Sequence, residues 1–159
     1  MPVQVGQEAP DFELPVKPGE APLRLSDYRG ERSVVLLFFP LAFSPICTEE
    51  LMSVAHGYEE WKALDVEVIG ISVDSPFVTE KFARECGAAF PILSDFNRKV
   101  SEAYGVKCDD FFGMHGVAHR AAFVVSPEGR VLYSRVCEDP GTMPDFEAIR
   151  LALREGAAV

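Results

Sequence analysis

The chain of 159 residues carries a formal net charge of -10 at neutral pH, and 48% of its residues are hydrophobic while 25% are charged. This composition is typical of a soluble domain with a sizeable core, so we expect residues 1–159 to form a single domain. The negative charge argues against nucleic acid or an anionic membrane surface as the main partner of the protein. The sequence lacks an apolar run long enough to cross a bilayer and, over residues 1–10, the pattern of a secretion signal, so we expect a cytoplasmic protein.

The N-terminal region predicts a small β extension ahead of the main fold. Two short strands are expected near residues 12–14 and 22–25, on either side of a turn at residues 17–20. Ser26 then favours the start of a short helix that ends near Gly30, because serine side chains commonly cap helix N-termini.

A cysteine lies between a predicted central strand and a predicted helix. The run over residues 34–39 is apolar at every position, which is typical of a strand covered on both faces of a sheet. From about Cys47 to Leu64, apolar residues recur at three- and four-residue intervals, which predicts an amphipathic helix. The first turn of a helix presents unpaired N–H groups and partial positive charge, and both favour thiolate over thiol. The position of Cys47 therefore suggests a nucleophile.

The second half of the chain continues the alternation of strands and helices. The sequence predicts, in order, a strand over residues 66–73, a helix over 75–86, a strand over 91–93, a helix over 97–104, a hairpin of strands 121–125 and 130–136, and a final helix from Met143 or Asp145 to Arg154. This pattern describes an α/β domain of three layers with a mixed β-sheet, which is the thioredoxin-like fold with an N-terminal β extension. Ligand sites of such sheets lie beyond the carboxyl ends of the parallel strands, where Cys47 is expected.

Four cysteines are spread along the chain, and they are Cys47, Cys86, Cys108 and Cys137. Their wide spacing, without a C-x-x-C pair or closely spaced histidines, argues against a zinc site. A disulfide scaffold is also disfavoured, because a domain of this size has a core and does not need covalent staples. We expect no metal and no cofactor, and reactive chemistry for at least one thiol.

The residues around Cys47 resemble the active-site motif of a known enzyme family. The sequence Pro40-x-x-x-Ser44-x-x-Cys47 resembles that of the peroxiredoxins, the cysteine-based peroxidases. With Glu50 three residues further on, it is similar to the alkyl hydroperoxide reductase E type, which is close to the bacterioferritin comigratory type. The similarity covers nearly the whole chain, and it includes the segments Gly6–Phe12, Gly70–Asp74, Phe90–Asp95, Ala103–Val106 and Arg120–Val125.

The resemblance implies a peroxiredoxin fold and a role for each residue of the motif. Cys47 is expected to attack the terminal oxygen of a peroxide and to become a sulfenic acid. Pro40 is expected to shield the thiolate from water, and Ser44 to donate its hydroxyl to the thiolate or to the peroxide. Arg120 matches the family's cation that favours the thiolate and polarises the peroxide, and Glu50 is expected to orient Arg120.

A second thiol must reduce the sulfenic acid, and the resemblance does not identify it. Many bacterioferritin comigratory relatives keep a resolving cysteine five residues after the nucleophile, where this chain has Met52. Cys86 is expected at the far end of its helix, roughly 15 Å from the helix start, and Cys108 in a loop, so both are candidates of lower rank. A mechanism that uses Cys47 alone with an external thiol also remains open.

Cys137 ranks first among the candidates for the resolving cysteine. Arg120 begins a predicted hairpin at the active-site end of the sheet, so its partner strand must return to that end. If the turn pairs Val125 with Arg130, Arg120 lies opposite Arg135, and Cys137 stands two residues beyond it. Cys137 is then expected at the same end of the sheet as the nucleophile.

Apolar side chains near the motif are expected to line a pocket for alkyl or lipid hydroperoxides, and these are Phe39, Leu41, Phe43 and Ile46. Loop aromatics of this kind also pack against second subunits, so we expect a homodimer. His119 adjoins Arg120 and is interpreted either as a structural residue or as part of the active-site wall.

The sequence thus predicts a thiol-dependent peroxidase that reduces hydrogen peroxide, organic hydroperoxides or peroxynitrite. The expected reductant is thioredoxin, a glutaredoxin-like protein or a low-molecular-weight thiol. Two alternatives stay open. One is a peroxide sensor or holdase that uses Cys47 as a switch, and the other is a thiol-disulfide oxidoreductase, which the absence of C-x-x-C disfavours.

Overall fold

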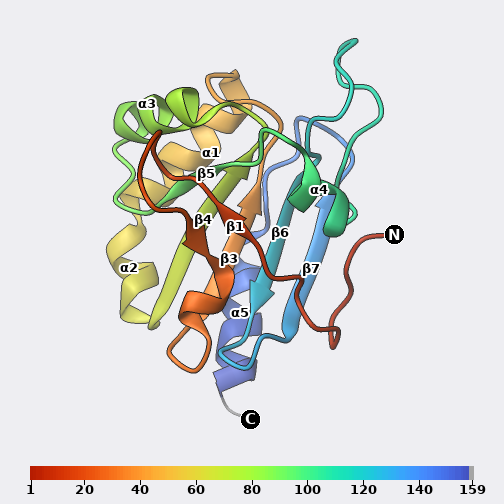
Figure 1. Cartoon of the computed structure of the whole chain (residues 1–159). Coiled ribbons are helices and arrows are strands. Elements are labelled where there is room, and N and C mark those ends of the chain that lie inside the picture. Colours follow the sequence, from red (N-terminus) through yellow and green to blue (C-terminus); the bar gives the residue numbers. More distant parts are fainter. Residues whose placement is uncertain (158–159) are drawn as a thin grey trace.

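A mixed sheet of five strands forms the centre of the molecule (Figure 1). The structure is a computed structural model that describes residues 1–157. β3 (Ser33–Phe38), β4 (Val66–Ser72) and β5 (Ile92–Ser94) run parallel, whereas β6 (Arg120–Val125) pairs antiparallel with β3, and β7 (Val131–Cys137) pairs antiparallel with β6. The spatial order is β5-β4-β3-β6-β7, so β3 lies in the middle, as its apolar sequence predicts.

The sheet is covered on both faces (Figure 1). Apolar side chains of α1 (Pro45–His56), α2 (Tyr58–Ala63), α3 (Pro76–Cys86) and α5 (Phe146–Ala157) pack on one face. The other face is covered by α4 (Lys99–Ala103) and the N-terminal extension. A strand with helices or extensions on both sides must be apolar at successive positions, which explains the sequence of β3. The predicted three-layer α/β fold is confirmed.

The N-terminal extension forms the predicted small β structure. β1 (Glu13–Leu14) pairs antiparallel with β2 (Leu23–Arg24), and a 3-10 helix, η1 (Leu25–Tyr28), follows. This helix begins one residue before Ser26, the cap that the sequence suggested. Its start is held instead by the N–H of Arg24, which donates to a carboxylate oxygen of Asp27 at 3.1 Å.

The single helix predicted over residues 47–64 is divided into α1 and α2. α1 begins earlier, at Pro45, with Ser44 in the N-cap position. Gly57 separates the two helices, because a glycine inside a helix costs roughly 0.5–1 kcal/mol relative to alanine and readily ends it. The earlier start makes Cys47 the third residue of α1, which still lies in the first turn.

α3 agrees with its prediction. The Ser75 hydroxyl accepts a hydrogen bond from the N–H of Val78, Pro76 occupies the first helical position, and Gly87 ends the helix in the left-handed conformation with φ of 70°. Cys86 is the last residue of this helix, which starts at the carboxyl end of β4 and runs away from it. In the part of the chain that the structure describes, no helix has both the length and the apolar character needed to cross a bilayer.

The register of the β6–β7 hairpin differs from the predicted one by two residues. Val125 pairs with Val131 instead of with Arg130, and a bulge next to this pair shifts the rest of the ladder by one more residue. Arg120 therefore lies opposite Cys137 rather than opposite Arg135. Because side chains alternate with a period of two, a shift by two residues leaves each side chain on its predicted face.

Candidate active site

Cys47 is fully buried in the first turn of α1, just after the carboxyl end of β3. Residues 40–44 form the loop that connects the strand to the helix. The first hydrogen bond within the helix is donated by the N–H of Thr48 to the Ser44 carbonyl, at 2.9 Å. The N–H groups of Ile46 and Cys47 come before it and have no carbonyl acceptor within the helix. The sulfur is thus close to the positive end of the helix dipole.

The guanidinium of Arg120 contacts the Cys47 sulfur. Its Nη1 and Nη2 atoms each lie 3.4 Å from Sγ. Arg120 is the first residue of β6, and strand alternation directs its side chain to the face that α1 covers, together with Ala122 and Val124. Only 2% of Arg120 is exposed, so this charge-assisted contact is shielded from water.

Glu50 holds Arg120 from the same helix that carries Cys47. Its Oε1 atom accepts a hydrogen bond from Nη1 of Arg120 at 2.5 Å, and both side chains are almost completely buried. Residues three apart in a helix share a face, so Cys47 and Glu50 both project toward the guanidinium. Nη2 of Arg120 also donates to the carbonyl of Pro140 at 3.2 Å. Arg120 therefore joins α1 to the segment that follows β7.

Burial controls the charges of this pair. It raises the pKa of the Glu50 carboxyl to about 7, because the loss of hydration outweighs the attraction of Arg120. Burial alone would lower the pKa of Arg120, but the negative groups of Glu50 and Cys47 raise it above its ordinary value, so the guanidinium stays charged. Glu50 Oε2 and Arg120 Nε are buried without a hydrogen-bond partner among the described residues, which leaves a spare donor on the guanidinium.

Asp74 fixes the loop ahead of Cys47. Its Oδ2 atom accepts hydrogen bonds from the Ala42 N–H and from the Ser72 hydroxyl, both at 2.7 Å. The Asp74 carbonyl also accepts the hydroxyl of Ser94, so the loop is joined to the ends of β4 and β5. Sequence reasoning did not identify this role, although an acidic residue two positions after a parallel strand was an available signal.

The Ser44 hydroxyl is directed differently from the expectation. It donates to the Leu41 carbonyl at 2.9 Å and closes a turn within the loop, instead of donating to Cys47. Phe43 has φ of 69°, and this left-handed residue folds the loop back so that the carbonyl comes within reach of the hydroxyl. The Ser44 carbonyl serves the helix, since it accepts both the N–H and the hydroxyl of Thr48. Ser44 therefore shapes the loop.

A cavity of about 330 Å³ opens beside Arg120, where β3 and β7 end and β6 begins. Its wall includes Pro40, Phe111, Phe112, His119, Arg120 and Cys137. Cys47 has no exposed surface and contacts this wall through Arg120. His119 thus belongs to the wall, which agrees with the second of its two interpretations. The two phenylalanines come from a loop without helical or strand periodicity, so the sequence pattern did not single them out.

The predicted pocket residues do not line this cavity. Phe39 continues the alternation of β3 into the helical layer, where it is fully buried against Phe82, with ring centroids 5.5 Å apart. Phe43 is 48% exposed and packs on the same ring of Phe82 at 5.1 Å. Leu41 packs against a small apolar cluster that contains Cys108, and Ile46 is half-buried in the first turn of α1. These four residues thus lie outside the wall of the cavity beside Arg120, and their contact with a substrate stays a prediction.

The other three cysteines differ in their relation to the cavity. Cys137 and Cys108 are both on its wall. Cys86 ends α3, and a helix of 11 residues at about 1.5 Å per residue places it roughly 15 Å from the helix start. All four cysteines are buried free thiols in this structure.

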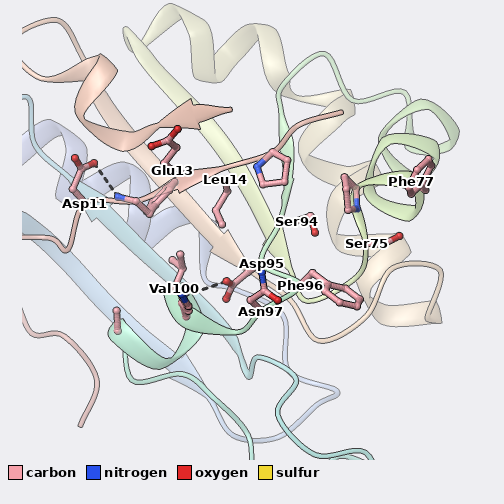
Figure 2. Close-up of a pocket in the computed structure, with 15 residues that line it drawn as sticks. Asp11, Glu13, Leu14, Ser75, Phe77, Ser94, Asp95, Phe96, Asn97 and Val100 are labelled. Carbon is pink, nitrogen blue, oxygen red and sulfur yellow. Dashed lines mark hydrogen bonds between the residues drawn. The ribbon is translucent and has the colours of Figure 1, made fainter. Parts of the chain in front are cut away.

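A larger cavity of about 740 Å³ lies between the N-terminal extension, the start of α3 and α4 (Figure 2). The Asp95 carboxylate in its wall serves the fold, because it accepts hydrogen bonds from the N–H groups of Val100 and Ser101 and so holds the start of α4. The wall of this cavity contains none of the residues that contact Cys47. The smaller cavity is therefore the candidate active site.

Comparison with known proteins agrees with the geometry. The pattern of the AhpC/TSA family matches residues 5–134. Alkyl hydroperoxide reductase E of Mycobacterium tuberculosis is 37% identical over 145 residues, which cover 90% of this chain and 91% of that protein. A chloroplastic 2-cysteine peroxiredoxin of Chattonella marina var. antiqua is 37% identical over 145 residues, which cover 86% of this chain and 72% of that protein.

Solved structures give the same result. The crystal structure of peroxidoxin BcpB from Mycobacterium tuberculosis matches with a TM-score of 0.80 at 31% identity, over 98% of this chain and 97% of that chain. Enterococcus faecalis AhpC matches with a TM-score of 0.83 at 29% identity, over 98% of this chain and 93% of that chain. The chain therefore belongs to the AhpC/TSA family of peroxiredoxins, which are thiol-dependent peroxidases with a thioredoxin-like fold.

Proposed function

We propose that the protein reduces hydrogen peroxide, organic hydroperoxides and peroxynitrite by direct attack of the Cys47 thiolate on the peroxide. The strongest support is the contact of Arg120 with the Cys47 sulfur through two nitrogens at 3.4 Å, in a site where Glu50 holds the guanidinium. A cation in this place favours the thiolate at rest, and it favours the negative charge that develops on the departing oxygen.

The proposed reaction transfers one oxygen atom to sulfur. The Cys47 thiolate attacks the terminal peroxide oxygen, the O–O bond breaks, and the second oxygen leaves with the electron pair of that bond. The leaving group of hydrogen peroxide or an alkyl hydroperoxide then takes up a proton and departs as water or alcohol. Sulfur, oxidised by two electrons, remains as a sulfenic acid.

The cavity beside Arg120 supports the entry of peroxides that carry an organic group. Phe111 and Phe112 place two rings on its wall with centroids 4.8 Å apart, and Arg120 supplies a charged end. A space of about 330 Å³ falls within the ordinary range of small-molecule sites, which is about 300–1,000 Å³. We infer that the apolar wall receives the organic substituent while the peroxide group faces the guanidinium.

Rapid mixing of the reduced protein with hydrogen peroxide tests the proposal. The loss of the Cys47 thiol, measured by mass spectrometry after quenching, is expected to be second-order and far faster than oxidation of free cysteine. Cys47→Ser is expected to abolish peroxide consumption, whereas Cys86→Ser, which alters a buried cysteine at the end of α3, is expected to leave it unchanged. Oxidation no faster than that of a free thiol, or full activity without Cys47, would refute the proposal.

Turnover separates an enzyme from the alternative functions. A peroxidase consumes many equivalents of peroxide for each chain when a thiol reductant is supplied. In a sensor or holdase that uses Cys47 as a switch, the oxidised form persists and turnover stays slow under the same conditions, and a thiol-disulfide oxidoreductase exchanges disulfides without peroxide. Assaying peroxide consumption with excess dithiol therefore distinguishes the three.

We further propose a homodimer that works in the cytoplasm and takes electrons from thioredoxin, a glutaredoxin-like protein or a low-molecular-weight thiol. The four buried free thiols support a reducing compartment. The exposed rings of Phe43 and Phe77, at 48% and 72%, support contact with a second subunit. Sedimentation velocity over a range of protein concentrations is the test, and a species of monomer mass at every concentration would contradict the dimer.

A further inference from the structure

We propose that Cys137 is the thiol that resolves the Cys47 sulfenic acid, so that the two residues form an intrachain disulfide in each catalytic cycle. This inference rests on the proposed function, because it needs the sulfenic acid that peroxide forms on Cys47. It assigns a second catalytic residue that lies outside the motif around the nucleophile.

Cys137 and Arg120 face each other across the β6–β7 ladder. Directly paired residues of antiparallel strands point to the same side of the sheet, with Cβ atoms about 4.5–5.5 Å apart. Arg120 points to the side that α1 covers, where its guanidinium contacts Cys47. The Cys137 thiol is therefore on the nucleophile's side of the sheet, beside the stem of the side chain that touches the nucleophile.

The segment after Cys137 is bonded to the same guanidinium. Nη2 of Arg120 contacts the Cys47 sulfur at 3.4 Å and donates to the Pro140 carbonyl at 3.2 Å, three residues beyond Cys137. Cys137 is the last residue of β7, and its pair with Arg120 is the last pair of the ladder. A movement of Cys137 toward Cys47 therefore begins at the end of the ladder, with this final pair and the Pro140 contact.

The resolving step balances without an added oxidant. The Cys137 thiol attacks the sulfur of the Cys47 sulfenic acid, the S–S bond forms and the S–O bond breaks, and the departing hydroxide leaves as water with the thiol proton. An external dithiol then reduces the disulfide by thiol-disulfide exchange and restores both thiols. A disulfide requires Cα atoms about 4.4–6.8 Å apart, so the step includes a local approach of the two segments.

The surroundings of the two thiols suit different roles. The guanidinium lies directly on the Cys47 sulfur. Burial raises the pKa of Cys137, and the cations of Arg135 and Arg120 oppose this only in part. Cys137 is therefore protonated in the resting protein, and it does not compete with Cys47 for peroxide.

The remaining cysteines are less well placed for this step. Cys108 lines the same cavity, but its sulfur donates to the Asp110 carbonyl at 3.2 Å, and its backbone is paired with Val117 and Gly116 inside the loop. Cys86 closes α3 at the end of the helix that is remote from the active-site edge of the sheet.

Non-reducing peptide mapping of the full-length protein after one equivalent of hydrogen peroxide tests the assignment. We expect peptides joined through Cys47 and Cys137 in the wild type. Cys137→Ser is expected to lose this link and to accumulate a sulfenic acid that dimedone traps. Cys108→Ser, which changes the other thiol on the cavity wall, and Cys86→Ser, which changes a remote buried thiol, are both expected to keep the link.

The possible results separate this assignment from the proposed function. A Cys47–Cys108 peptide pair, or a sulfenic acid as persistent in the wild type as in Cys137→Ser, would overturn the role of Cys137 and leave the peroxidase proposal standing. A Cys47 thiol that peroxide does not oxidise in the wild type would overturn both. The peptide map uses the unaltered chain, so its result does not depend on the folding of any variant.

Discussion

Both terminal nitrogens of Arg120 lie 3.4 Å from the Cys47 sulfur, although 73 positions separate the two residues in the chain. We predict that Arg120→Lys slows Cys47 oxidation by about tenfold to hundredfold. Lysine keeps the positive charge but lacks the planar guanidinium that contacts the sulfur and Glu50 at the same time. The expected factor follows because a hydrogen bond to a charged group is worth about 1.5–3 kcal/mol. The rate is measured by rapid mixing with hydrogen peroxide. Arg84→Lys, at an exposed position of α3, is the control, and equal rates in both variants would contradict the prediction.

Glu50 gives the protein a defined pH dependence of stability. Its pKa rises from an ordinary 4.5 to about 7 in the folded state, so between these values the folded chain holds a proton that the unfolded chain has released. The contribution that this proton makes to the free energy of unfolding is therefore fully present below about pH 4.5, and it is lost as the pH rises toward and through 7.

We predict that Glu50→Gln removes this part of the decline, because glutamine does not titrate and still offers an oxygen to Arg120. Urea unfolding at intervals between pH 4.5 and 7 measures the effect against the wild type. Glu49→Gln changes the adjacent, exposed carboxylate of α1 and is expected to keep the wild-type slope. A Glu50→Gln profile parallel to that of the wild type would show that the carboxyl titrates normally.

The sequence predicted the elements whose signals are local. β3 is apolar throughout and is central, and Ser75, Pro76 and Gly87 mark both ends of α3 where the structure has them. The division of α1 from α2 also has a local signal in Gly57, which the strong apolar periodicity of residues 47–64 outweighed in the prediction.

Features that depend on tertiary structure were not predictable in the same way. The pairing of Arg120 with Cys137 results from two changes of register, a turn that pairs Val125 with Val131 and a bulge next to this pair, and the bulge is set by the packing of the two strands. The wall formed by Phe111 and Phe112 comes from an irregular loop, whose position relative to Arg120 no periodicity encodes. The motif around Cys47 was readable because strand, loop and helix follow each other directly.

Asp74 tests whether the loop ahead of Cys47 must be held in place. Asp74→Ala leaves the Ala42 N–H and the Ser72 hydroxyl without their acceptor, which costs about 1–3 kcal/mol of stability. We also predict that Cys47 oxidation slows by about tenfold or more, since small displacements of reacting groups have effects of up to about hundredfold.

Urea unfolding and rapid mixing with hydrogen peroxide measure the two effects of Asp74→Ala separately. Asp109→Ala, which changes an exposed acidic residue of the loop after α4, is expected to alter neither. A variant that loses stability but oxidises Cys47 at the wild-type rate would show that the anchor serves the fold alone.

Phe112 tests whether the cavity beside Arg120 receives the organic part of a hydroperoxide. Its ring is 81% exposed and forms part of the cavity wall, so its removal is expected to disturb the core little. If a phenyl substituent buries roughly 40 Å² against this ring at about 25 cal/mol per Å², Phe112→Ala slows oxidation by cumene hydroperoxide by about fivefold. Hydrogen peroxide has no apolar group to contact the ring, and its rate is expected to stay unchanged. Phe96→Ala removes a ring that is 57% exposed and lines the other cavity, and it should affect neither substrate. An equal loss with both peroxides in Phe112→Ala would mean that the ring supports the loop rather than the substrate, since only a direct contact distinguishes the two peroxides.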